Sequence, residues 1–166
     1  MKTLSLFVAS LLVSTGASFA QFNNTAIVTE TGKDHIALIQ QVGIQNESNV
    51  IQSNKKNKAI VTQTNQNVLN STYSEVKQSG EENLATVSQV GTSSLTGLGT
   101  GELKALVDQT GNRNEALQVQ GSHEKQGQAF AQILQSGNDN YAAQYQVKYG
   151  NHAIINQSGN MISAIQ

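Results

Sequence analysis

The stretch from residue 135 to residue 157 reads QSGNDNYAAQYQVKYGNHAIINQ and contains one pattern twice. Asn, Ala, a third residue and Gln follow one another at every second position, first from Asn140 to Gln146 and then, eleven residues later, from Asn151 to Gln157. Spacing by two places these side chains on one face of a β-strand. Gly137 and Gly150 lie in the short gaps between strands, where glycine favours turns. A repeated strand-and-turn unit of this kind predicts a β-solenoid.

The same phase extends outward over the chain from Asn24 to Gln166 and predicts twelve strands. Ala or Ser holds the second inward place in every unit, a regularity that a merely Gln- and Asn-rich disordered chain would not maintain. Longer gaps occur at residues 64–71, 90–102 and 121–128, where we expect loops. Each gap follows an even-numbered strand, as expected if two strands make one rung. We therefore predict an all-β fold, a cross-β solenoid with two strands per rung and about six rungs.

Stacked rungs would place the inward Gln and Asn side chains above one another, as hydrogen-bonded amide ladders along the stack. Glycine in the Gln-x-Gly step permits the positive φ of a tight turn. The residues expected to form the self-assembly ladders are Gln41, Gln52, Gln63, Gln78, Gln89, Gln109, Gln120, Gln135, Gln146, Gln157, Asn46, Asn57, Asn83, Asn114, Asn140 and Asn151. The expected turn residues are Gly43, Gly80, Gly91, Gly111, Gly137 and Gly159.

The N-terminus has the features of a secretory signal peptide. A positively charged start at Lys2 is followed by an apolar run from Leu4 to Val13 and by a small residue at Ala20. We expect residues 1–20 to be removed and residues 21–166 to form one secreted domain. No later apolar run is long enough to cross a bilayer, so we do not expect a membrane-embedded protein. The chain contains no Cys, so neither disulfides nor a lipid-modified cysteine can stabilise or anchor it.

Composition and spacing exclude the common chemical functions. A net charge of −1 with 13% charged residues provides no long-range field to attract nucleic acid. His35, His123 and His152 lie in separate units without metal-ligand spacing. The glycine-rich residues 97–101 lack the Lys-Ser/Thr ending of a phosphate loop, and nothing orders Ser, His and Asp into a triad. We therefore expect no enzyme, no metal site and no cofactor.

The motif Gln-x-Gly-x-x-Asn-x-Ala-x-x-x-Gln is present from Gln78 to Gln89, from Gln109 to Gln120 and from Gln135 to Gln146. It resembles the repeat of the curlin family, the secreted subunits of curli amyloid fibres, and the resemblance covers essentially all of residues 24–166. The resemblance implies a functional amyloid exported through an outer-membrane secretion pore. Such a protein polymerises at the cell surface into extracellular, pilus-like fibres of the biofilm matrix, for adhesion and cell aggregation. The implied partners are other copies of the chain, the pore, and a curli nucleator or major subunit.

Departures from the repeat leave two questions open. Glu30 and His35 replace Gln and Asn in the first rung, which fits either the major fibre subunit or the minor nucleator. The alternative function is a monomeric β-solenoid that binds a surface such as ice or a glycan. That function predicts an outward Thr-x-Thr row on every rung, and the row at residues 25–29 is not repeated in residues 47–51.

The outward residues of the two sets of strands differ in character. In the odd-numbered strands they include charged residues, namely Glu47, Glu75, Lys77, Lys104 and Asp108. In the even-numbered strands they are mostly apolar, namely Ile36, Leu38, Ile60, Leu84, Leu117, Val119, Tyr141, Tyr145 and Ile165. An apolar strip along a stack predicts an interaction surface, and we expect lateral association, or adhesion to apolar surfaces, through the even-strand face. The alternative is that these side chains only reflect the strand propensity of apolar residues.

Overall fold

The computed structural model describes residues 23–66, 70–91, 101–122, 127–147 and 150–166. The expected signal peptide, residues 1–20, lies outside the described residues. Within them every regular element is a β-strand, which confirms the all-β prediction. The described residues include no helix that is long and apolar enough to cross a membrane.

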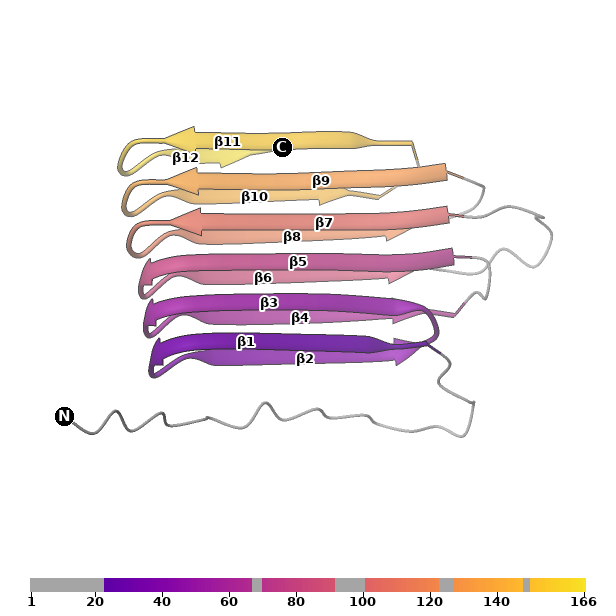
Figure 1. Ribbon diagram of the computed structural model, residues 1–166. Coiled ribbons are helices and arrows are strands. Elements are labelled where there is room, and N and C mark those ends of the chain that lie inside the picture. The colour runs from indigo at the N-terminus through magenta and orange to yellow at the C-terminus, as the bar shows by residue number, and fades with distance from the viewer. Residues whose placement is uncertain (1–22, 67–69, 92–100, 123–126, 148–149) are drawn as a thin grey trace.

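The strands form two parallel sheets that face each other (Figure 1). One sheet has the order β1-β3-β5-β7-β9-β11 and the other β12-β10-β8-β6-β4-β2, so each rung takes one strand from each sheet. We number the rungs from β1 and β2, which form rung 1, to β11 and β12, which form rung 6. The predicted solenoid of two strands per rung is confirmed. The strands are β1 Thr25–Lys33, β2 Ile36–Gly43, β3 Asn46–Lys55, β4 Lys58–Asn65, β5 Asn70–Glu81, β6 Leu84–Gly91, β7 Gly101–Thr110, β8 Glu115–Ser122, β9 Gly127–Ser136, β10 Tyr141–Gln146, β11 His152–Ser158 and β12 Ser163–Ile165.

Neighbouring rungs keep the register that the repeat predicts, whatever the length of the insertion between them. Ala59 pairs with Ala85 and Ala85 with Ala116, although the second pair is separated by more residues than the first. A shift of one residue would turn the inward side chains to the solvent, so the buried face holds the register.

Parts of the three segments predicted to be loops are β-strand in the structure. β4 continues to Asn65 and β5 begins at Asn70, so the expected loop at residues 64–71 is partly strand. The ends of the other two insertions are also strand, at Gly91, Gly101 and Gly121. The reason is that the added residues pair with those of the next rung, as Asn70 does with Gly101. Extra backbone pairing satisfies N–H and C=O groups that a loop would leave to solvent.

Small side chains let the two sheets approach closely. Ala59, Ala85, Ala105, Ala116 and Ala142 are fully buried between the sheets. The next inward place holds a β-branched residue in most strands, and these side chains are also buried: Ile39, Val50, Val61, Val76, Val87, Val107, Ile133 and Ile155. The rest of the interior is filled mainly by the buried amide side chains of Gln and Asn.

Glycine is required where consecutive turns stack. Gly137 has a φ of 114°, and a Cβ added there would lie 1.9 Å from the carbonyl oxygen of Gly159. Gly80, Gly111 and Gly159 lie in equivalent turns of the same column, whereas Gly43 is the last residue of β2. Five of the six glycines predicted to lie in turns have positive φ, namely Gly43, Gly80, Gly111, Gly137 and Gly159.

The prediction of a turn at Gly91 is wrong. Gly91 is the last residue of β6 and is not among the residues of positive φ. Gly91 instead pairs with Asn65 and Ser122 in the even-strand sheet.

We expect Gly137→Ala to lower the free energy of unfolding by about 2 kcal/mol or more, because it adds a left-handed penalty to the clash with Gly159. The measurement is a urea titration followed by circular dichroism. Gly121→Ala is the matched control, since a Cβ at Gly121 meets nothing within 4 Å. Equal midpoints for the two variants would contradict the steric role of Gly137.

Candidate functional site

Two continuous glutamine ladders run through the interior, one in each sheet. In the odd-strand sheet, Nε2 of each Gln donates to Oε1 of the Gln one rung further along the chain. This odd ladder joins Gln52, Gln78, Gln109, Gln135 and Gln157 at 2.7–2.9 Å. The even ladder joins Gln41, Gln63, Gln89, Gln120 and Gln146 at 2.9–3.0 Å. The structure thus places every glutamine that the sequence assigned to a ladder in one.

Each ladder amide has a second N–H, and this one crosses to the opposite sheet. Gln89 Nε2 donates to the carbonyl oxygen of Tyr73 at 3.0 Å, and Gln78 Nε2 to that of Lys58 at 3.1 Å. These side chains are buried, with Gln89 fully so. One amide therefore links its rung to the next rung and its sheet to the facing sheet.

A third, shorter ladder was missed from the sequence. Gln118 Nε2 donates to Gln144 Oε1 at 3.1 Å, and Gln144 Nε2 to Gln166 Oε1 at 3.4 Å. The available signal was Gln at the third inward place of successive even strands. Gln118 Oε1 is buried without a partner, because Val87 stands at this place in the preceding rung.

Asparagine side chains form a column at the start of the even strands. The Oδ1 atom of each Asn accepts the backbone N–H of the Asn in the next rung, at 3.0–3.1 Å, and the column consists of Asn57, Asn83, Asn114 and Asn140. Their Nδ2 atoms donate to the turn carbonyls of the following rung, as Asn140 does to Gly159 at 2.9 Å. In rung 1, His35 replaces Asn, and its Nδ1 accepts the N–H of Asn57 at 3.3 Å.

The odd strands have no continuous asparagine column. Asn46 donates to Asn24 Oδ1 at 3.1 Å and accepts from Thr72 Oγ1 at 2.6 Å. Asn151 is exposed, and the preceding rung carries Ala129 at the equivalent place. The structure therefore does not bring Asn151 into a ladder, because the residues that follow the insertions have lost the amide.

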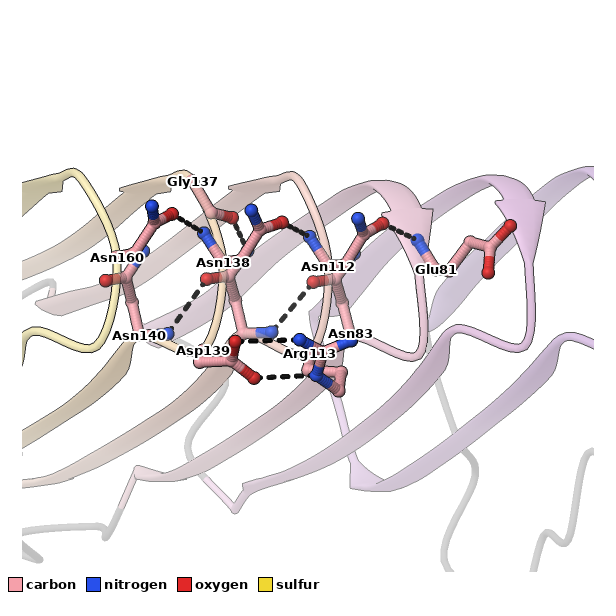
Figure 2. Close-up of polar contacts among 10 residues, drawn as sticks. Glu81, Asn83, Asn112, Arg113, Gly137, Asn138, Asp139, Asn140 and Asn160 are labelled. Carbon is pink, nitrogen blue, oxygen red and sulfur yellow. Dashed lines mark hydrogen bonds and ion pairs between the residues drawn. The ribbon is translucent and has the colours of Figure 1, made fainter.

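The turns that join the two strands of each rung carry charges of alternating sign. The third turn residue is acidic, basic, acidic, basic and acidic in rungs 1 to 5, namely Asp34, Lys56, Glu82, Arg113 and Asp139. Ion pairs join Lys56 Nζ to Glu82 Oε1 at 3.1 Å and Arg113 Nε to Asp139 Oδ1 at 2.7 Å (Figure 2). Hydrogen bonding to Arg113 lowers the pKa of Asp139. This alternation was missed from the sequence, where it is visible as a sign change at one turn position.

A second asparagine column lies beside these charges. Asn138 N–H donates to Asn160 Oδ1 at 2.8 Å, and Asn112 N–H donates to Asn138 Oδ1 at 2.9 Å (Figure 2). Glu81 N–H continues the series by donating to Asn112 Oδ1 at 2.9 Å. The turns of rungs 3 to 6 are thereby hydrogen-bonded to one another through side chains as well as through the strands.

The outer face of the odd strands has a charged centre. The Tyr73 hydroxyl donates to Glu75 Oε2 at 2.7 Å, and Lys77 forms an ion pair with Glu75. Burial, together with the bond to Glu75, raises the pKa of Tyr73 to about 12. Lys104 Nζ lies 5.3 Å from the centre of the Tyr73 ring. The charged groups of Glu75, Lys77 and Lys104 are therefore all in contact with neighbours on this face.

The predicted contrast between a charged odd face and an apolar even face is incomplete. Ile27 in β1 and Ile154 in β11 are large apolar side chains that are about half exposed on the odd face, at 51% and 47%. The even face is interrupted by Lys58 and Glu115 at outward places. The exposed apolar residues gather at the ends of the stack more than on one side of it.

Within the described residues, no three His, Cys, Asp or Glu side chains lie close enough together to hold a metal ion. His35 is engaged in the asparagine column, and His152 stacks on Phe130 with ring centres 4.8 Å apart. His123 lies outside the described residues.

We expect Gln89→Leu to lower the free energy of unfolding by about 2–5 kcal/mol, because the amides of Gln63 and Gln120 each lose a buried partner. A denaturant titration gives the difference from the unmodified chain. Gln132→Leu is the control, since Gln132 is at an outward place, and should change stability little. An unchanged midpoint for Gln89→Leu would refute the role of the ladder.

Reversing one turn charge should destabilise the stack in a salt-dependent way. Arg113→Glu would place three acidic side chains in consecutive turns, with Glu82 and Asp139 as neighbours. We expect a lower thermal midpoint than for Arg113→Gln at low salt, and convergence of the two variants at about 1 M salt, where screening is strong. If the two variants unfold alike at low salt, the alternation has no energetic role.

Comparison of the chain with models of known protein families, with curated proteins and with solved structures gave no match. The likeness to curlin repeats therefore stays a prediction from the motif in the sequence. The geometry that bears on function consists of the amide ladders and the strand edges at which they end.

Proposed function

We propose that the protein is a secreted structural subunit that self-assembles into curli-like functional amyloid fibres of a biofilm matrix, for adhesion and cell aggregation. The observation that carries this proposal is the open parallel edge at each end of the stack. In the described part of the chain, no strand pairs with the outer side of rung 1 or with that of rung 6 (Figure 1). An unpaired edge presents a row of N–H and C=O groups that can pair with another strand.

The two ends complement each other in sequence. If one copy continues the solenoid of another, Ala153 and Ile155 of β11 fall beside Ala26 and Val28 of β1. Any shift by one residue would turn these side chains outward. Parallel pairing also requires that the end of one copy meets the beginning of the next, so addition has one direction.

Exposed apolar side chains concentrate where such a joint would form. Of the ten large hydrophobic residues that are exposed among the described residues, seven belong to rungs 1 and 6. In the continuing register Ile154 falls beside Ile27, and Ile165, which is 72% exposed, falls beside Leu38. Joining the ends would therefore remove apolar surface from water, which favours association.

The resemblance to curlin repeats supplies the rest of the proposal. The chain would leave the cell through an outer-membrane secretion pore after loss of residues 1–20 and would join a cell-surface fibre. It would act there either as the major subunit or as the nucleator, with other copies and the second curli subunit as partners. No nucleic acid and no cofactor enters this function.

A monomeric surface-binding module has one observation in its favour. A hydroxyl side chain stands at one outward place in every rung, and these residues form the column Thr31, Ser53, Ser79, Thr110, Ser136 and Ser158. The adjacent outward column is irregular, with Ile51, Lys77 and Asp108 among its members. A single column of hydroxyl groups offers only a narrow regular surface for binding. The complementarity of the two ends of the stack therefore favours self-assembly over surface binding.

The proposal is tested by assembly of residues 21–166. The chain is purified in denaturant, diluted, and followed by thioflavin fluorescence and electron microscopy. We expect fibres whose diffraction shows the spacing of stacked strands at about 4.8 Å. A chain that stays monomeric and soluble for days would overturn the proposal.

Matched variants locate the contact between copies. Ile27→Lys combined with Ile154→Lys places two like charges across the proposed joint. Their repulsion raises the activation free energy of addition, and fibre growth should slow by at least about tenfold. Asn49→Lys combined with Gln132→Lys changes the same outward column inside the stack and should grow nearly as the unmodified chain does.

A further inference from the structure

One member of the odd ladder column is a carboxyl group. Glu30 pairs in register with Gln52, at the place where every later odd strand has Gln. Gln52 Oε1, which points toward this first rung in the ladder order, is buried and has no hydrogen-bond partner. A carboxylate cannot supply one, because its oxygens only accept.

Turning the Gln52 amide over does not remove the mismatch. Its Nε2 donates to Gln78 Oε1 at 2.7 Å and to the carbonyl oxygen of Ile36 at 3.3 Å. Reversal would bring two amide oxygens together at Gln78 and would give up the bond across the sheets. The same pair of bonds recurs at Gln78, Gln109 and Gln135, so the ladder has one direction.

At the other end of the column, the Gln157 side chain has an N–H group that does not donate to another glutamine. In the preceding rung, one N–H of Gln135 crosses to the Glu115 carbonyl and the other continues to Gln157 at 2.9 Å. Gln157 keeps the cross-sheet bond, to Tyr141 at 2.9 Å, and turns its other N–H to the carbonyl oxygen of Ile162 in its own rung at 3.0 Å. In a longer stack this N–H would reach the next rung instead.

Resting on the proposed function, we infer that copies of this chain join with Gln157 of one copy against Glu30 of the next, and that the joint closes with a proton on Glu30. A neutral carboxyl group both accepts and donates. Its carbonyl oxygen accepts the Gln157 N–H, and its O–H donates to the unpartnered Gln52 Oε1. The ladder is then continuous from one copy to the next.

The ionised form suits the joint poorly. It would accept from Gln157 but would leave Gln52 Oε1 unpaired and would place a charge between two rungs of neutral amides. Burial of an unpaired charge is far more costly than burial of a neutral hydrogen-bonded group. In rung 1 of a free copy, by contrast, Glu30 is only partly buried and its outer side faces solvent.

Among the described residues, no cation forms an ion pair with the carboxylate at this corner. Two strands pack against β1: neutral Gln52 faces Glu30 from β3, and the inward residues of β2 are Ala37, Ile39 and Gln41. The titratable groups nearby lie in turns, at Lys33, Asp34, His35, Lys55 and Lys56. Within the described residues none of them forms an ion pair with Glu30, and His35 uses its ring nitrogens for Asn57 and Thr31. The arriving rung 6 has Asn160 and Met161 in its turn, which are uncharged.

Assembly should therefore take up one proton per copy wherever exposed carboxyl groups are ionised. By linkage, the concentration of soluble chain in equilibrium with fibres should rise about tenfold per pH unit between about pH 6 and pH 8. The measurement is the residual soluble concentration of residues 21–166 after seeded growth at each pH.

Glu30→Gln should flatten this pH dependence, because Gln supplies a donor to Gln52 at every pH. Glu47→Gln is the control: it removes the same charge from an exposed outward place on β3 and should keep the slope of the unmodified chain. Gln157→Glu should steepen the slope toward two protons per copy, about a hundredfold per pH unit, because it places two carboxyl groups in the joint.

The outcomes separate this inference from the proposed function. If neither the unmodified chain nor Glu30→Gln forms fibres at any pH, the proposed function fails. If both form fibres with the same pH dependence, or if the unmodified chain assembles better as the pH rises, fibres exist but the protonated joint is refuted. A slope at Gln157→Glu equal to that of the unmodified chain would show that Gln157 does not meet Glu30.

Discussion

The structure depends on a glutamine side chain that donates two hydrogen bonds in different directions. One N–H continues to the next rung and the other crosses to the opposite sheet, as Gln89 does toward Gln120 and Tyr73. The second bond sets how far apart the sheets can lie. At that separation the interior accommodates Ala or Ser and one β-branched residue per strand, which explains why the apolar core is thin although the fold is regular.

A core of amides makes each rung depend on its neighbours. A buried amide is favourable only when its donors and acceptor are satisfied, and here the partners of one rung belong to the rungs beside it. Stability is then close to a sum over adjacent rungs, as in other repeat folds. The same dependence makes the ends different from the middle. Gln52 and Gln118 each have a buried oxygen without a partner, and each lies where a ladder begins.

The turns add a second means of holding the rungs in order. Their charged residues adopt a left-handed backbone with φ between 52° and 59°, which points the side chains outward in one column. Alternating sign means that every neighbour in the column is opposite in charge, from Asp34 to Asp139. Exposed ion pairs contribute little stability singly. Here they act against incorrect stacking of the rungs, because a slip by one rung would place like charges side by side.

The strands, the two-strand rung and the membership of both long glutamine ladders could be predicted from the sequence. These follow from a period of two and a return after eleven residues, which the pleat of a strand converts directly into faces. Four features required the three-dimensional structure: the direction of the ladders, the short ladder from Gln118, the strand conformation of Gly91 and the exclusion of Asn151 from a column. Each of these depends on what stands in the next rung, 22 to 31 residues away, and local spacing carries no information about that partner.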